Sequence, residues 1–300
     1  MMRLPHLSRD IPQVPGPGAE KLRDPRHARR VWLIVAALVA VLGILSGPLG
    51  ISTLLDAMRR DFVAMRYVQS AAGALAARPV DRGAVVAMVD RAVQIAPDNS
   101  IVAKQAGVLY MYAGAYPKAV ARLSRIPERD LATEISLGHC LLLTGRRESG
   151  TRILQKATQQ AYARRRSSAI GPVAYALYMN NIGYAYAAAG VELQRAHSLL
   201  TEAVRLDPLQ PAFIDSLGWA YYQSRDPKQA LFYLERAVRL AGPFNSAETY
   251  YHLGAAYSRM GRVRPAAEAL LKALECDPEY QDAQAELHKL GYTLPQPSRA

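Results

Sequence analysis

Small and apolar residues recur along most of the chain with the spacing expected of paired helices. The clearest unit contains Gly254, Tyr257, Ala266, Leu270, Ala273 and Pro278, and its positions recur in two earlier units as Gly218, Tyr221, Ala230, Leu234, Ala237 and Pro243, and as Gly183, Tyr186, Ala196, Leu200, Ala203 and Pro208. The marker glycines lie 35 and 36 residues apart. A unit of this length holds two antiparallel helices, and its small residues mark places where the helices approach too closely for larger side chains. The pattern predicts stacked helical hairpins.

Three degenerate units precede the regular ones and bring the predicted number to six. They contain Gly73, Ala92 and Pro97; then Gly107, Tyr110, Ala119 and Leu123; then Gly138, Leu141, Gly150, Leu154 and Ala157. We therefore expect degenerate repeats over 56–165 and three regular repeats over 176–280. The longer gap between them contains Arg164–Arg166 and a Gly-Pro turn, and it predicts a basic loop or hinge over 166–175. Residues 281–300 are expected to form a capping helix, over 282–290, and a tail.

These units resemble the tetratricopeptide repeat. The resemblance implies an all-α fold, a right-handed α-solenoid of about six helix-turn-helix repeats. It also implies a protein that binds peptides or other proteins and is not an enzyme. In this family the first helix of each repeat lines a concave groove.

The family's groove positions can be carried over residue by residue. They select Lys104, Met111, Tyr112, His139, Asn180, Tyr184, Asp215, Trp219, Tyr222, Gln223, Tyr251, Ser258 and Arg259. From Met179 to Gly183 the chain also resembles the first helix of kinesin light chain repeats, which implies that Asn180 and Asn181 hydrogen-bond the backbone of an extended peptide. An amide suits that role because it both donates and accepts.

We predict a protein-binding groove formed by repeats four to six. Its predicted residues are Lys104, Tyr112, Asn180, Asn181, Tyr184, Asp215, Trp219, Tyr222, Gln223 and Tyr251, with Trp219 as an aromatic anchor. The carboxylate-clamp variety of the fold is excluded, since Ile135, Asp215 and Tyr251 stand where the clamp needs other residues.

The N-terminal region differs in composition from the repeats. Residues 1–30 are rich in proline and glycine and end in a basic run, which predicts a disordered tail. Residues 31–55 carry no charge, and a helix of this length would span about 37 Å, enough to cross a bilayer. We expect an uncleaved membrane anchor; a cleaved signal peptide is the alternative.

The charges that flank this segment predict its orientation. Five Lys or Arg residues lie close to its N-terminal side, whereas Arg59, Arg60 and Arg66 on the other side are diluted by Asp56 and Asp61. The positive-inside rule places the tail in the cytoplasm and the repeats outside it, in the periplasm of a bacterium with two membranes.

Charge and candidate chemistry narrow the function classes. The net charge of +12 favours an acidic partner or surface. No two histidines are spaced to share a helical metal site, and no nucleophile or phosphate-binding motif is present. Cys140 and Cys276 are expected to be buried free thiols. Neither a cofactor nor nucleic acid is expected.

The sequence thus predicts a membrane-anchored scaffold that captures a peptide or protein partner, in envelope biogenesis, secretion or assembly of a membrane complex. The alternative is a structural oligomer whose repeat faces form the interface.

Overall fold

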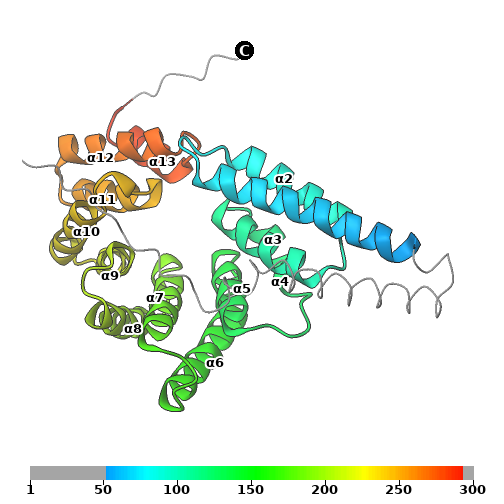
Figure 1. Ribbon diagram of the computed structural model, residues 1–300. Helices are drawn as coiled ribbons and strands as arrows, with labels where there is room; N and C mark the ends of the chain where they lie inside the picture. Colours follow the sequence, from blue (N-terminus) through cyan, green and yellow to red (C-terminus); the bar gives the residue numbers. More distant parts are fainter. Residues whose placement is uncertain (1–51, 293–300) are drawn as a thin grey trace, which may run out of the picture. The chain divides into compact units, whose positions relative to one another are not determined.

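The computed structural model describes residues 52–292 (Figure 1). The chain divides into two compact units, residues 1–60 and residues 61–300. The predicted tail and most of the predicted membrane segment lie outside the described residues; residues 52–55 are helical. No helix in the described range is long and apolar enough to cross a membrane.

The described residues form helices and no strand. Residues 52–76 form a helix that pairs with α2 (Arg82–Ile95), and five further hairpins follow. These are α3 (Ser100–Tyr112) with α4 (Tyr116–Leu123), α5 (Leu131–Leu143) with α6 (Arg147–Arg166), α7 (Pro172–Ala188) with α8 (Leu193–Leu206), α9 (Pro211–Gln223) with α10 (Pro227–Ala241), and α11 (Ala247–Arg259) with α12 (Val263–Cys276). A short 3-10 helix, η1 (Gly242–Phe244), follows α10, and α13 (Gln281–Lys289) follows α12. The predicted α-solenoid of six hairpins with a final helix is confirmed in these residues.

The marker glycines are the points of closest approach inside the hairpins. A Cβ placed on Gly183, Gly218 or Gly254 would lie 2.6–2.8 Å from the Cγ atom of Leu200, Leu234 or Leu270 in the second helix of the same hairpin. Gly107 and Gly138 meet Leu123 and Leu154 in the same way. A real Cβ cannot sit this close to a buried leucine, so glycine is what lets the leucine dock.

The first hairpin departs from this rule. Gly73 lies near the end of its helix and has no atom within 4 Å of a hypothetical Cβ. Its helix meets α2 through Ala64, Val68 and Ala71 instead. The prediction that Gly73 marks a close approach is therefore wrong, because Gly73 lies on an exposed side of its helix.

The predicted basic hinge over 166–175 contains a short loop, residues 167–171, between the ends of two helices. Arg164–Arg166 form the last turn of α6, and α7 begins at Pro172. The extra residues between Gly138 and Gly183 lengthen α6 to 20 residues and α7 to 17. Basic side chains suit the last turn of a helix, where they face the negative end of its dipole.

The C-terminal end of the array is covered by α13. Ala283 and Leu287 of α13 pack on Leu270 and Ala273, so α13 buries the exposed face of the last hairpin as predicted. Cys140 and Cys276 are buried free thiols, and burial raises the pKa of Cys140 to about 12.

The glycine contact makes a matched pair of substitutions informative. We expect Gly218→Ala to lower the free energy of unfolding by about 2–3 kcal/mol, because the new methyl group overlaps Leu234. Gly73→Ala should leave it unchanged or raise it by about 0.5–1 kcal/mol, since the helix gains a better former in open space. Chemical denaturation of both variants measures the difference, and equal effects would contradict the packing described here.

Candidate functional site

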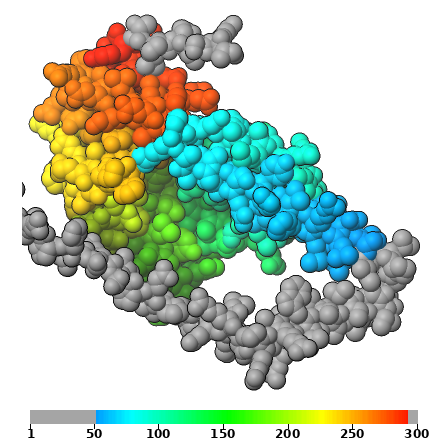
Figure 2. All heavy atoms as spheres, turned by 45° about the horizontal axis from the view of Figure 1, so that its top comes forward, coloured from blue at the N-terminus to red at the C-terminus, as the bar shows by residue number. Residues whose placement is uncertain are grey.

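The segment before α2 contacts the last hairpin. The Val80 N–H donates to the Cys276 carbonyl at 3.0 Å, and Arg82 Nε lies 2.5 Å from Asp277 Oδ2. The Arg82 guanidinium also lies 5.3 Å from the centre of the Tyr280 ring. Figure 2 shows this N-terminal segment, in cyan, against the orange C-terminal hairpin. We call these contacts the clasp.

The clasp closes one side of a cavity of about 1140 Å³ inside the second unit. Its walls come from α3, α5, α7 and α11, the first helices of four hairpins, and from segments 75–82 and 276–284. The first helices line the concave side, as the family resemblance implied. The cavity includes α7 and α11 of the predicted repeats four to six, but it also includes helices of repeats two and three and does not include α9.

The cavity wall is acidic although the chain is basic. It holds four carboxylates, those of Glu248, Asp277, Glu279 and Asp282, and two guanidinium groups, which leaves a net charge of −2. Asp277 is paired with Arg82. Within the described residues, no ion pair involves the other three carboxylates. The expectation of an acidic partner, drawn from net charge alone, does not fit this surface.

Four tyrosines line the same cavity: Tyr112, Tyr116, Tyr184 and Tyr280. The Tyr184 hydroxyl donates to Glu248 Oε1. Burial and, next in size, the Glu248 carboxylate raise the pKa of Tyr116, Tyr184 and Tyr280, that of Tyr116 to about 12. These three therefore stay neutral at pH 7, and all four tyrosines surround one carboxylate.

His139 adds a polar group to the wall. Its ring lies edge-on to Tyr184, with centroids 5.6 Å apart, and its Nε2 atom is buried without a hydrogen-bond partner in the described residues. Burial lowers the pKa of His139 to about 4, so the imidazole is neutral at pH 7.

Of the ten predicted groove residues, three line the cavity: Tyr112, Asn181 and Tyr184. Asn181 is exposed and accepts a hydrogen bond from Asn180, which is itself buried. Lys104 lies elsewhere on α3 and pairs with Asp130, the residue that caps α5.

Trp219 is an interior residue rather than an exposed anchor. Trp219 is only 6% exposed. Its ring stacks on the rings of Tyr222 and His252, with centroid distances of 4.5 Å and 4.0 Å. Tyr251 lies at a tilt, 5.7 Å away. The position one residue after the marker glycine faces the next hairpin here, so the aromatic ring joins α9 to α11.

Asp215 supports the same contact. It is buried and lies 3.0 Å from His252 Nδ1. The prediction that Asp215 faces a ligand is therefore wrong. Arg259 stacks on Tyr222, with 3.5 Å from the guanidinium carbon to the ring centre, and Gln223 lies at the end of α9, outside the cavity lining.

Sequence reasoning missed Glu248, Tyr116, Tyr280 and the clasp residues. Glu248 lies in the first turn of α11, away from the marker glycine, and Tyr280 follows the turn after α12. No local pattern identifies them, because the clasp brings together groups that are 195 residues apart.

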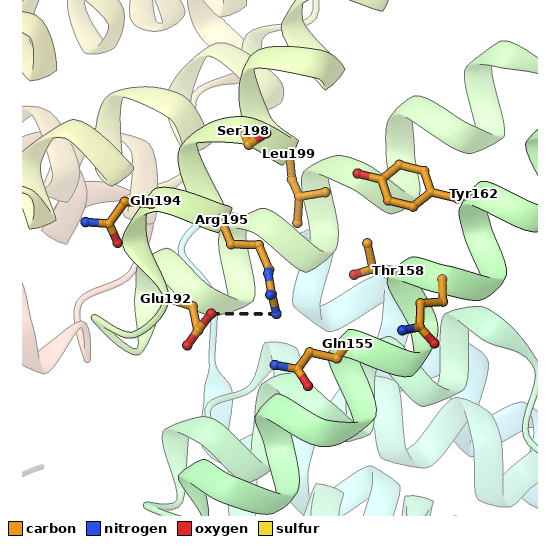
Figure 3. Close-up of a pocket in the computed structure, with 9 residues that line it drawn as sticks. Gln155, Thr158, Tyr162, Glu192, Gln194, Arg195, Ser198 and Leu199 are labelled. Atoms are coloured by element: carbon orange, nitrogen blue, oxygen red, sulfur yellow. Dashed lines mark ion pairs between the residues drawn. The ribbon is translucent and has the colours of Figure 1, made fainter.

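A second cavity, of about 830 Å³, lies between α6 and α8. Figure 3 shows Arg195 of α8 pointing between the helices towards Gln155 of α6, with Glu192 beside it. Arg195 and Glu192 pair at 3.6 Å, so the charged groups here neutralise one another. This cavity is formed by second helices, and we regard the concave cavity as the candidate site.

Comparison with known proteins agrees with the repeat assignment. The family model of the tetratricopeptide repeat matches residues 215–243 and 247–280, the last two hairpins. No curated protein matches the chain.

Several solved structures are similar to this chain. The first repeat domain of Spaghetti (RPAP3) bound to the HSP90 peptide SRMEEVD has 24% identity and a TM-score of 0.35, covering 39% of this chain and 90% of that one. MamA AMB-1 has 21% identity and a TM-score of 0.39, covering 58% and 96%. The Cut9–Hcn1 hetero-tetramer of APC/C has 14% identity and a TM-score of 0.47, covering 76% of this chain and 48% of that one.

Breaking the clasp should destabilise the protein more than breaking a surface ion pair. Arg82→Ala leaves Asp277, whose side chain is 3% exposed, without its cation, and should cost about 3 kcal/mol of unfolding free energy. Lys104→Ala removes the exposed pair with Asp130 and should cost less than about 1 kcal/mol. Denaturation curves compare the two, and similar losses would show that the clasp contributes little.

The Asp215–His252 pair predicts a pH dependence of stability. Burial favours the neutral imidazole, but the Asp215 carboxylate raises the pKa of His252 above 6.5. Since the folded-state pKa is the higher one, the pair contributes fully below about pH 6.5 and loses its contribution as pH rises through the folded-state value. The stability difference between the native protein and His252→Gln should therefore shrink from pH 6 to pH 9. A difference that stays constant or grows would contradict an ionised pair.

Proposed function

We propose that this protein is a scaffold that binds an extended segment of a partner protein in its concave cavity. The observation that carries the proposal is that the first helices of four hairpins converge on one open space. At about 1140 Å³, it exceeds the roughly 300–1,000 Å³ typical of small-molecule sites.

The lining offers what an extended backbone needs. Asn181 is exposed there, and its amide can both donate to and accept from a peptide. Tyr112 is 60% exposed and combines an apolar ring with a hydroxyl, which suits a residue that anchors a partner. Asn181 is also one of the two asparagines that resemble those of kinesin light chain repeats, and this supports the same role.

We propose further that residues 31–55 anchor the protein in a membrane, with the tail in the cytoplasm and the repeats on the other side. The uncharged sequence and its flanking charges support this. The helix over 52–76, which overlaps the end of this segment, exposes Leu54, Leu55, Met58 and Phe62. Anchoring would raise the local concentration of the repeats near membrane-bound partners, so modest affinity would suffice for a role in envelope biogenesis, secretion or assembly of a membrane complex.

Site-specific photo-crosslinking in cells tests the scaffold proposal. A benzoylphenylalanine in place of Tyr112 lies in the cavity, whereas one in place of Gln194 lies in the second cavity between α6 and α8 and serves as the matched control. We expect a discrete crosslinked partner at position 112, enriched at least about ten-fold over position 194.

Two other outcomes would count against this proposal. Equal crosslinking at both positions would show that the cavity is not the binding site. Crosslinking of position 112 to a second copy of this chain would favour the structural oligomer.

A further inference from the structure

We infer that the bound segment carries a lysine or arginine whose cationic group is received by Glu248 and the tyrosines around it. This inference rests on the proposed function and specifies the chemistry of the partner at the same site.

In the described residues, three other tyrosines donate to a carboxylate and have a Lys or Arg near the ring. Tyr110 of α3 donates to Asp90 of α2 at 2.6 Å, Lys118 Nζ of α4 lies 2.7 Å from the same carboxylate, and Lys118 lies 5.7 Å from the centre of the Tyr110 ring. The tyrosine hydroxyl thus donates a hydrogen bond to the carboxylate, and the lysine forms an ion pair with the same carboxylate while lying near the tyrosine ring.

Two further tyrosine–carboxylate pairs also have a guanidinium group near the ring, although no ion pair joins that group to the carboxylate in the described residues. Tyr175 donates to Glu202 at 2.8 Å, and Arg165 lies 5.9 Å from the Tyr175 ring centre. Tyr257 donates to Glu235 at 2.9 Å, and Arg262 lies 5.9 Å from the Tyr257 ring centre. Arg239 also lies 4.0 Å from Glu235.

The pair formed by Tyr184 and Glu248 is the exception. The hydroxyl donates to the carboxylate as in the other three pairs, but no Lys or Arg of the described residues pairs with Glu248 or lies over the Tyr184 ring. Glu248 is exposed and lines the cavity, so its remaining lone pairs face the space that a partner would enter.

The surroundings favour a cation over a neutral or acidic group. Tyr112, Tyr116 and Tyr280 line the same space and present further aromatic rings, and Asp282 and Glu279 add negative charge without neutralising partners in the described residues. An acidic side chain entering here would meet these carboxylates at close range, where repulsion is least screened.

The positive net charge of the whole chain does not cancel this preference. At physiological ionic strength, exposed charges are screened beyond about 8 Å. A cation inside the cavity therefore responds mainly to the wall, whose net charge is −2. Complementary charge at this distance decides which side chain is accepted.

Binding of peptide pools to the full-length protein tests the inference. Four fluorescent decapeptide pools share the same randomised flanking residues and differ only in a central Lys, Arg, Gln or Glu. By fluorescence anisotropy, we expect the Lys and Arg pools to bind at least ten-fold more tightly than the Gln pool, and the Glu pool to bind most weakly.

Glu248→Gln should reduce the preference for Lys over Gln to about two-fold or less, because the amide keeps the shape of the side chain and removes its charge. Glu202→Gln is the matched control, because Glu202 also accepts from a tyrosine but lies outside the cavity lining. The Glu202→Gln variant should prefer the Lys pool over the Gln pool as strongly as the native protein does. Thermal unfolding confirms that both variants fold.

The outcomes separate this inference from the proposed function. Equal binding of the four pools, or the same loss of preference in both variants, would overturn the cationic specificity and leave peptide binding standing. No binding of any pool would overturn both. Binding that appears only after the five basic residues between Lys21 and Arg30 are neutralised would assign the cavity to the chain's own N-terminal segment and overturn the assignment to a partner.

Discussion

The close approach of a glycine to a leucine inside each hairpin is the constraint on which the array depends. In five hairpins a leucine of the second helix occupies the space that a Cβ would take on the first helix. This fixes the separation of the two helices, and the alanines of the same pattern let the next hairpin pack behind them. In each hairpin the second helix covers one side of the first helix. The first helices of four hairpins line the same cavity with another side.

Two further interactions position the polar residues that line this cavity. The aromatic stack of Tyr222, Trp219 and His252 joins α9 to α11, and this places Glu248 at the start of a firmly held helix. The clasp then brings Tyr280 and Asp282 to the same space as α3 and α5. The residues with the most distinctive chemistry thus come from helix ends and turns, whereas the helix centres provide the scaffold.

The hairpins and the final helix could be predicted from the sequence, because each depends on residues within about 35 positions of one another. Gly183, Gly218 and Gly254 encode their own contacts, and α13 follows from an amphipathic segment after Pro278.

The residues of the candidate site were harder to predict. Trp219 was expected in the groove and is buried. The side of α9 that carries Trp219 is covered by α11 of the next hairpin. Glu248 was missed because its role arises only when the first and last hairpins meet, and the small rotation between successive repeats that brings them together is not written in any local pattern.

The clasp also changes how this repeat protein should come apart. Open arrays of repeats fray from their ends, where the outermost unit has a neighbour on one side only. Here Val80 and Arg82 give the first hairpin a second neighbour, the last hairpin, which is distant in sequence. Closing so long a stretch of chain has an entropic cost and is slow to achieve. Once these contacts have formed, the first hairpin should fray less readily than the end of an open array, because its loss also breaks the contacts with Cys276 and Asp277.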